Sequence, residues 1–200
     1  MTGTPALLIA TANAGKLREM RALLEIPGLR LVSLDELGAV PEIEEGSDYA
    51  ENARLKALSL ARRSGMWTVA DDSGLEVDAL GGAPGPHSAR IAGEGATDAD
   101  RRRLLISLLQ AHPRPWTARF RCTMALAGPL GSIDLTAGVC EGEVVPTEAG
   151  TGGFGYDPIF LLSERGLTMA ELGEVEKNRL SHRARAVANA EPILKEILGI

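Results

Sequence analysis

The stretch W-T-V-A-D-D-S-G-L-E-V-D-A-L-G-G-A-P-G, residues 67–85, decides how this sequence is interpreted. Its opening residues are typical of a β-strand, and two adjacent carboxylates, Asp71 and Asp72, follow directly. We expect Ser73 and Gly74 to turn the chain, so that the strand ends at the acids. Open α/β sheets bind ligands at the ends of their strands, and carboxylate oxygens suit Mg²⁺. The stretch therefore predicts a metal-binding sheet edge, although D-D-S-G alone more often marks an ordinary β-turn.

Length and composition are those of a soluble globular protein. The 200 residues suffice for one domain over residues 1–200, or for two tightly joined lobes. The net charge of −6 argues against a general nucleic-acid-binding surface. No apolar run is long enough for a membrane span, and no signal peptide is evident. Cys122 and Cys140 form no C-x-x-C motif, so we expect two buried thiols in a reducing cytoplasm.

The N-terminal segment has the order strand, polar loop, helix. Leu7–Ala10 is predicted as a buried strand, T-A-N-A-G-K follows at residues 11–16, and an apolar helical stripe begins at Leu17. Asn13 is a candidate N-cap and Lys16 adds a positive charge. This layout suits a phosphate group, because the amides of a helix N-terminus point at the loop. A capped helix with a solvated lysine is the alternative, since the Walker A pattern is absent.

The next segments supply a strand, an acidic loop and a helix. A strand is expected over 31–34 and a helix over 49–63. The loop P-E-I-E-E-G-S-D-Y from Pro41 lies between them. Glu44 or Glu45 could supply a second metal ligand, or the loop could simply be solvated.

The middle of the chain predicts antiparallel strands. Residues 81–86 are rich in Gly and Pro and are expected to form a rigid loop. Thr97 and Asp100 resemble a capping box that starts a helix. Residues 119–126 alternate apolar and polar, further strands are expected near 133–139 and at 144–145, and no helix intervenes. Together with the first βα unit, this pattern predicts a mixed sheet.

A glycine-rich segment, G-T-G-G-F-G-Y-D-P-I-F, occupies residues 150–160. Glycines permit close approach of the backbone to a flat ligand, and the ring of Phe154 offers a stacking face. Asp157 could accept hydrogen bonds from a base or sugar. The alternative is a loop with one phenylalanine in the core.

The C-terminal region combines helix signals with cationic side chains. Thr168 and Glu171 resemble a second capping box, and residues 192–198 predict a closing amphipathic helix. Lys177, His182 and Arg183 cluster near a helix start that Ser181 could cap. They could bind a ligand, or they could form a solvated basic helix.

These blocks together resemble the inosine triphosphate pyrophosphatase family, the XTP/dITP diphosphatases. The similar blocks are T-x-N-x-x-K at 11–16, A-D-D-S-G-L-E-V-D-A-L-G-G-A-P-G from Ala70, S-A-R at 88–90, G-T-G-G-F-G-Y-D-P-I-F from Gly150 and E-K-N-R-x-S-H-R from Glu176. They occur in the family's order and spacing and cover nearly the whole chain. The resemblance is therefore specific.

The resemblance implies a fold and an activity. The fold would be α/β, a long twisted mixed sheet flanked by helices, in two lobes with a central cleft. The protein would be a cytoplasmic homodimer that hydrolyses deaminated purine nucleoside triphosphates (ITP, dITP, XTP) to the monophosphate and pyrophosphate with Mg²⁺. A pyrophosphatase for modified pyrimidine nucleotides and a nucleotide-binding regulator without turnover are the competing functions.

The resemblance also assigns roles to residues of this chain. Asp72 would be the catalytic carboxylate and, with Glu45, a metal ligand. Substrate contacts would come from Thr11, Ala12, Asn13, Ala14, Gly15, Lys16, Ser73, Phe154, Gly155, Tyr156, Asp157, Lys177, His182 and Arg183. Among these, Phe154 to Asp157 would form the base-stacking loop, and His182 and Arg183 would be the pair that reads the base. The acidic loop is one residue shorter than the family pattern, which leaves Glu44 as an alternative to Glu45. His87 stands where the family usually has an apolar or aromatic residue.

Overall fold

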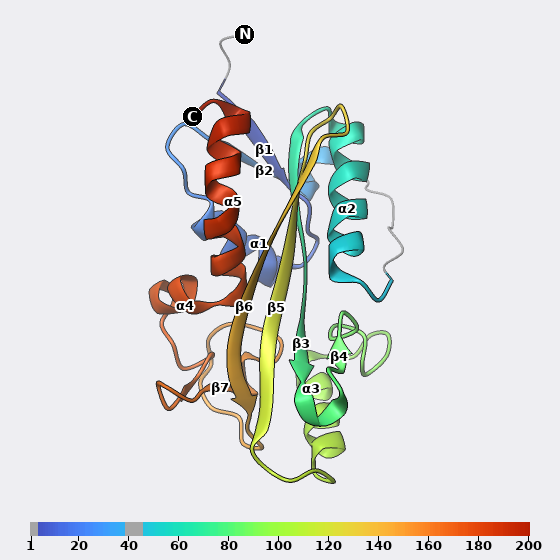
Figure 1. The fold of residues 1–200 in the computed structure, drawn as a ribbon, viewed down its shortest axis with the longest axis vertical. Helices are drawn as coiled ribbons and strands as arrows, with labels where there is room; N and C mark the ends of the chain where they lie inside the picture. Colours follow the sequence, from blue (N-terminus) through green and yellow to red (C-terminus); the bar gives the residue numbers. More distant parts are fainter. Residues whose placement is uncertain (1–3, 39–45) are drawn as a thin grey trace. The chain divides into compact units, whose positions relative to one another are not determined.

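The computed structural model describes residues 4–38 and 46–200, which form a mixed sheet with helices (Figure 1). The strand order is β2-β1-β3-β5-β6-β7-β8, with β4 paired to β3. The strands are β1 (Ala6–Ile9), β2 (Arg30–Ser33), β3 (Trp67–Val77), β4 (Pro84–Gly85), β5 (Trp116–Ala127), β6 (Ile133–Val144), β7 (Phe160–Leu162) and β8 (Leu167–Thr168). The helices are α1 (Ala14–Leu23), α2 (Tyr49–Ser64), α3 (Asp98–Leu109), α4 (Glu174–Leu180) and α5 (His182–Leu198).

Strand directions confirm the predicted mixed sheet. β1 runs parallel to both β2 and β3. The pairs β3–β4, β6–β7 and β7–β8 are antiparallel. Parallel pairing at the N-terminal end follows from the intervening helices, because parallel neighbours need a crossover connection.

The chain divides into two compact units, each assembled from segments that are far apart in the sequence. Unit 1 comprises Met1–Asp72, Cys122–Gly138 and Arg183–Ile200, and unit 2 comprises Ser73–Arg121 and Val139–His182. The chain passes from one unit to the other within β3, β5 and β6 and at the start of α5. The single domain over residues 1–200 stays a prediction.

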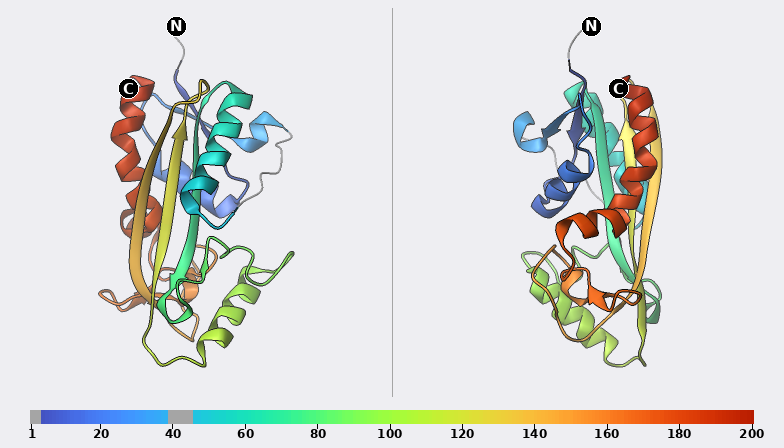
Figure 2. Two further views of the ribbon diagram at one scale, coloured as in Figure 1. Left: turned by 45° about the vertical axis from the view of Figure 1, so that its right-hand side comes forward. Right: turned by 90° about the vertical axis from the view of Figure 1, so that its left-hand side faces the viewer.

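Unit 1 has helices on both faces of its strands. Leu7 and Ile9 of β1 pack in one cluster with side chains of α1 and α5, whereas Leu8 and Ala10 pack in another with side chains of α2. Successive residues of a strand point to opposite faces, so β1 is apolar on both sides and is buried between the two layers. The right-hand view of Figure 2 shows α1 and α5 on the near side of these strands.

Unit 2 has its own apolar core. α3 contributes Leu105 and Leu109, β5 contributes Trp116 and Phe120, and the segment around β7 contributes Phe160. The rings of Phe120 and Phe160 pack with centroids 4.4 Å apart. This core anchors both α3 and the C-terminal end of the glycine-rich segment.

The predicted end of the strand at the acidic pair is wrong, because β3 continues through D-D-S-G to Val77. Gly74 does not adopt a left-handed conformation and makes no turn. A Cβ at Gly74 would instead lie 2.0 Å from the carbonyl oxygen of Gly85. The glycine is therefore needed for the close pairing of β4 with β3. Pro84 and Gly85, expected in an irregular loop, form β4.

The two predicted helix caps at Asn13 and Thr97 are confirmed. A third, at Thr168, is wrong, although its backbone N–H bonds the Glu171 carboxylate at 2.8 Å. The Thr168 hydroxyl donates to the carbonyl of Ala149 at 2.8 Å, and the next helix begins only at Glu174.

The remaining differences concern element lengths. β6 joins the two strands expected near 133 and 144 into one, and α5 extends ten residues N-terminal to Pro192, from His182. Cys122 and Cys140 are buried free thiols, as predicted. No helix within residues 4–38 and 46–200 combines the length and apolar character needed to cross a membrane.

Candidate functional site

The loop before α1 has the geometry of an anion-binding helix N-terminus. The Asn13 side chain accepts a hydrogen bond from the Lys16 N–H at 3.0 Å, and the Thr11 hydroxyl accepts one from the Asn13 N–H at 3.2 Å. Ala12 and Ala14 are exposed. Because the loop is internally braced while its small residues face solvent, it can accept an anionic group without rearranging.

Asp71 is a buried anion surrounded by cations of unit 1. Its Oδ2 lies 3.1 Å from the Lys16 Nζ and 3.1 Å from the Arg183 Nη2. Burial by itself would raise the pKa of Asp71, but Lys16, Arg183 and Lys56 together hold it well below its usual value. Asp71 therefore stays charged in the folded protein and acts as a fixed counter-ion.

Arg183 joins that carboxylate to a second one. Its Nη1 donates a short hydrogen bond to Oε2 of Glu19 on α1, while Nε and Nη2 bond Asp71. Burial opposes the charged guanidinium, but Asp71 and Glu19 more than offset this and raise the pKa of Arg183. The sequence-predicted base contact of Arg183 thus starts from a side chain that already bonds two carboxylates.

Asp72 is held by two side chains of α2. Its Oδ2 accepts a hydrogen bond from the Asn52 Nδ2 at 2.9 Å, and its Oδ1 lies 3.3 Å from the Lys56 Nζ. Lys56 also donates to the backbone oxygen of Asp71 at 3.0 Å, and Asn52 bonds both the N–H and the carbonyl of Gly46. Asp72 therefore has a fixed orientation.

Sequence reasoning missed Asn52 and Lys56 as partners of the acidic pair, and Glu19 as a partner of Arg183. Asn52 and Lys56 are four residues apart and so lie on one face of α2. That spacing was a usable signal, because the rest of the inward face of the helix is mostly alanine and leucine. Glu19 gave no comparable signal, since a single acid in an exposed-looking helix is common.

The residues around Asp72 fit a magnesium ion of the kind that binds with its substrate. No cluster of three metal-binding side chains occurs within residues 4–38 and 46–200. Mg²⁺ is commonly held by one or two carboxylates together with waters and phosphate oxygens. Asp72 provides such a carboxylate, whereas Asp71 is committed to Lys16 and Arg183. The predicted ligand Glu45 and its alternative Glu44 lie outside the described residues.

A second group of predicted residues comes together in unit 2. The Lys177 Nζ lies 2.5 Å from Oδ2 of Asp157 and 5.1 Å from the centroid of the Phe154 ring. Asp157 Oδ2 also accepts a hydrogen bond from the Phe154 N–H at 2.8 Å. A Cβ at Gly153 would lie 2.0 Å from the same oxygen, so only glycine fits there. The aromatic ring, the ammonium and the carboxylate therefore form one cluster.

Tyr156 and His182 are packed into unit 2. The Tyr156 hydroxyl donates to the carbonyl of Ser88 at 2.8 Å, and burial raises the pKa of the phenol. His182 is buried with its ring stacked on Phe120, centroids 4.8 Å apart. The Ser88 hydroxyl bonds the backbone of Leu75 and so fixes the S-A-R segment to β3.

Two further residues that the sequence singled out differ in burial. Ser73 is half-buried in β3 next to Asp72, and His87 is exposed. The contacts around His87 are those of a surface turn, with its N–H bonded to the carbonyl of Pro84 at 3.1 Å. Because His87 is on the surface, the presence of a histidine where the family usually has an apolar or aromatic residue does not affect the core.

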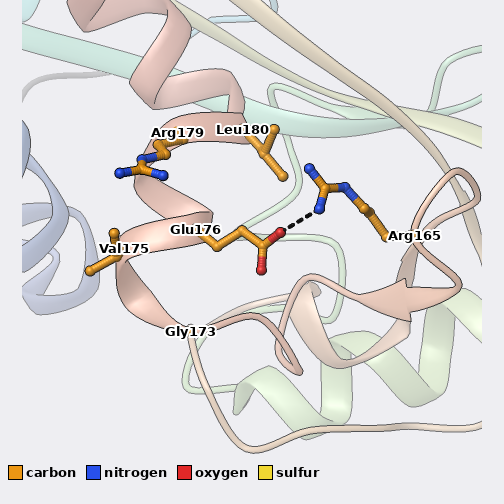
Figure 3. Close-up of a pocket in the computed structure, with 6 residues that line it drawn as sticks. All are labelled: Arg165, Gly173, Val175, Glu176, Arg179 and Leu180. Atoms are coloured by element: carbon orange, nitrogen blue, oxygen red, sulfur yellow. Dashed lines mark hydrogen bonds and ion pairs between the residues drawn. The ribbon is translucent and has the colours of Figure 1, made fainter.

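A pocket of about 470 Å³ lies beside α4 in unit 2 and contains none of the predicted site residues (Figure 3). An ion pair of 2.7 Å between Arg165 and Glu176 crosses it. Its lining is Arg165, Gly173, Val175, Glu176, Arg179 and Leu180. This pocket is not the candidate site, because its lining includes neither the acidic pair Asp71 and Asp72 nor the ring of Phe154.

Comparison with known proteins supports the resemblance seen in the motifs. The model of the Ham1 family matches residues 7–193. Proteins named dITP/XTP pyrophosphatase from Geobacillus kaustophilus and Geobacter sulfurreducens are each 47% identical over 195 residues, covering 96% of this chain and of theirs.

Two solved structures are also similar to this chain over nearly its whole length. A HAM1 protein from Coxiella burnetii is 39% identical with a TM-score of 0.87, covering 96% of this chain and 99% of that one. A nucleoside-triphosphatase / dITP/XTP pyrophosphatase from Mycobacterium abscessus is 39% identical with a TM-score of 0.75, covering 94% and 99%. Since the family model and these relatives all extend over nearly the full chain, the protein is a member of the Ham1 family.

Proposed function

We propose that this protein hydrolyses deaminated purine nucleoside triphosphates (ITP, dITP and XTP) to the monophosphate and pyrophosphate. The observation that carries the proposal is the fixed Asp72 carboxylate, bonded by Asn52 and Lys56 beside the cations around Asp71. Relatives with the name dITP/XTP pyrophosphatase support the substrate class.

Asp72 is proposed as the general base. It would take a proton from a water molecule as the water oxygen bonds to the α-phosphorus. The bond from that phosphorus to the α–β bridging oxygen breaks, and pyrophosphate leaves with the electron pair. Base assistance of this kind is typically worth about 10²–10⁴ in rate.

The phosphates are proposed to bind the loop Thr11–Lys16. Its amides and the α1 N-terminus favour negative charge. Lys16 and Lys56 add ammonium groups that would offset the charge of the leaving pyrophosphate. Asp71 supports this role, because an anion 3.1 Å from the Lys16 Nζ fixes the position of the lysine.

Mg²⁺ is the proposed cofactor. Asp72 would hold it with Glu45, and the bound ion would withdraw charge from the phosphate oxygens. The described carboxylates fit this assignment, since Asp72 makes hydrogen bonds and one contact of 3.3 Å with Lys56, whereas Asp71 is ion-paired to two cations.

The purine base is proposed to stack on Phe154 and to be recognised by His182 and Arg183, with Lys177 as a further substrate contact. Inosine and xanthosine carry a 6-oxo group, which accepts hydrogen bonds, where adenosine carries an amine. Donors placed at that position bond the oxygen and leave an amine unmatched, which costs affinity. The burial of His182 and of Arg183 supports this role, because buried donors discriminate most strongly.

A homodimer in the cytoplasm, with no nucleic-acid or membrane partner, is part of the same proposal. The acidic net charge supports the absence of a nucleic-acid partner, and the two free thiols support a reducing compartment. Light scattering coupled to gel filtration measures the mass of the particle in solution. A dimer would have twice the mass of one chain, which is 21.1 kDa.

The deciding experiment is a substrate panel with purified protein and Mg²⁺: ITP, dITP, XTP, GTP, ATP, dUTP and a methylated dTTP. We expect the highest kcat/KM for the first three, with monophosphate and pyrophosphate as products. Preference for a pyrimidine would favour the modified-pyrimidine enzyme, and binding without product would favour a regulator. Either result would overturn the proposal.

A further inference from the structure

The first turn of α3 contacts Gly155, in the middle of the segment Phe154–Asp157, through both backbone polar groups. Oδ2 of Asp98 accepts the Gly155 N–H at 2.8 Å. Nη1 of Arg102 donates to the Gly155 carbonyl at 2.7 Å. Asp98 and Arg102 lie four residues apart, on one face of the helix. The helix therefore holds this glycine from two sides. We refer to these two contacts, of Asp98 and Arg102 with Gly155, as the clamp.

Both clamping side chains are themselves fixed. Arg102 also donates from Nε and Nη2 to the two carboxylate oxygens of Glu148, at 2.9 and 3.0 Å. The other oxygen of Asp98 accepts from Arg101 at 2.6 Å. An arginine with a bidentate carboxylate partner has little freedom to move. α3 is in turn anchored in the unit 2 core by Leu105 and Leu109.

Gly155 needs such a hold because of its conformation. Its φ is +63°, and a Cβ there would meet no atom within 4 Å. Glycine in open space has more conformational freedom than any other residue. Its neighbours Phe154 and Asp157 carry the proposed stacking ring and the carboxylate that bonds Lys177. A shift at Gly155 would therefore move the base-binding cluster.

We propose that Asp98 and Arg102 are positioning residues that hold the segment Phe154–Asp157 and thereby set selectivity for the base. This inference rests on the proposed function, which gives that segment its ligand. Hydrogen bonds weaken steeply as distance and angle depart from the optimum. A loosened segment therefore loses discrimination between a 6-oxo and a 6-amino group. Reaction at the phosphates, which belongs to residues of unit 1, is affected far less.

The geometry also limits what Gly155 itself does. Since Asp98 occupies its N–H and Arg102 one lone pair of its carbonyl, we expect Gly155 to donate no hydrogen bond to a nucleotide and to contact it chiefly through the α-carbon. The absence of a side chain then serves close approach to the ligand.

Matched pairs of variants test the clamp. Asp98→Ala and Asp98→Asn both remove a negative charge near the N-terminus of α3, but only Asn retains an oxygen that can accept the Gly155 N–H. Arg102→Gln removes the carbonyl contact, and Arg103→Gln changes the same residue type one position on, where the side chain is 73% exposed. Arg102→Lys serves if the glutamine variant fails to fold.

Two measurements are made on each variant of the full-length protein. Hydrogen–deuterium exchange of the peptide containing Gly155, without nucleotide, reports the clamp directly. Initial rates with ITP and with ATP report selectivity. In Asp98→Ala and Arg102→Gln we expect exchange about tenfold faster and a KM for ITP about tenfold higher. We expect kcat within about twofold of the parent. Asp98→Asn and Arg103→Gln should stay close to the parent in both.

The outcomes separate the clamp from the function. Unchanged exchange in Asp98→Ala and Arg102→Gln would overturn the clamp, whatever the activity. Faster exchange with an unchanged ITP-to-ATP ratio of kcat/KM would overturn its role in selectivity. Parent protein that hydrolyses no deaminated purine nucleotide would refute the proposed function and with it the selectivity role, while exchange would still decide whether α3 holds Gly155.

Discussion

Arg183 and Asp71 form an ion pair from which water is almost fully excluded: Nη2 lies 3.1 Å from Oδ2, and each side chain exposes 1% of its surface. Glu19 bonds the same guanidinium. Two carboxylates on β3 and α1 thus share one cation that comes from the start of α5.

Arg183→Ala should destabilise the protein by about 3–5 kcal/mol, because it leaves Asp71 and Glu19 buried with less compensation. The free energy of unfolding from urea titrations measures this. Arg179→Ala, an exposed arginine of α4, is the control and should stay within about 0.5 kcal/mol of the parent.

The same variant tests the predicted base contact of Arg183. If the guanidinium also reaches the base, the preference for ITP over ATP falls in the folded fraction of Arg183→Ala. A ratio of kcat/KM values that does not change would confine Arg183 to holding the two carboxylates.

Asp72→Asn should reduce kcat by about 10²–10⁴, because the amide cannot take a proton from water. The protein should stay folded with a modestly lower melting temperature, because the new amide oxygen can accept from only one of the two donors, Asn52 and Lys56, and its NH₂ group faces the other. Phosphate release from ITP in the presence of added pyrophosphatase measures kcat. Asp134→Asn, at an exposed position of β6, is the control. Near-parent turnover in Asp72→Asn would remove it as the base.

Gly74→Ala should cost about 1–3 kcal/mol, because the new methyl group would lie 2.0 Å from the Gly85 carbonyl and force β4 away from β3. Gly173→Ala is a matched control, since a Cβ at Gly173 meets nothing within 4 Å and its φ is −65°. Thermal unfolding of both variants compares them. Equal melting temperatures would mean that the β3–β4 contact can relax freely.

Asp100 gives a prediction about pH. Hydrogen bonds from the side chain and backbone of Thr97 and from Arg103 lower the pKa of Asp100 to about 2 in the folded protein. A carboxyl whose folded pKa lies below its unfolded value of about 3.9 stabilises the fold above that value. The contribution is lost as pH falls through about 2.

The stability difference between the parent and Asp100→Asn should therefore be full at pH 6 and shrink toward pH 2. Urea unfolding at a series of pH values measures it. A constant difference for Asp100→Asn across this range would contradict the assigned hydrogen bonds.

Local signals in the sequence predicted much of this fold. Asn13 and Thr97 cap helices as expected, because a cap depends only on residues within the next turn. The signal at Thr168 misled for a tertiary reason, since its hydroxyl bonds Ala149, nineteen residues away. Gly74 was misinterpreted similarly, because its close neighbour Gly85 belongs to another strand.

The candidate site was predictable where its residues lie in compact motifs. The segment Phe154–Asp157 and Lys177 do form one cluster in unit 2. The contact of Lys16 with Asp71 was not predicted, since Lys16 was expected only as a phosphate ligand. Asn52 and Glu19 were missed because each meets its partner only after helices pack on strands. No spacing in the sequence encodes the contact of Glu19 with Arg183, 164 residues away.

The order in which the segments occur along the chain has a consequence for synthesis on the ribosome. All of unit 2 precedes Arg183, whereas α5 supplies Ala186, Val187, Ala190 and Leu194 to the core of unit 1. Unit 1 therefore cannot complete its core until α5 has left the exit tunnel, although its first strand is translated well before unit 2. A nascent chain in which α5 is still inside the tunnel would expose the apolar face of β1 and α1 to chaperones and proteases.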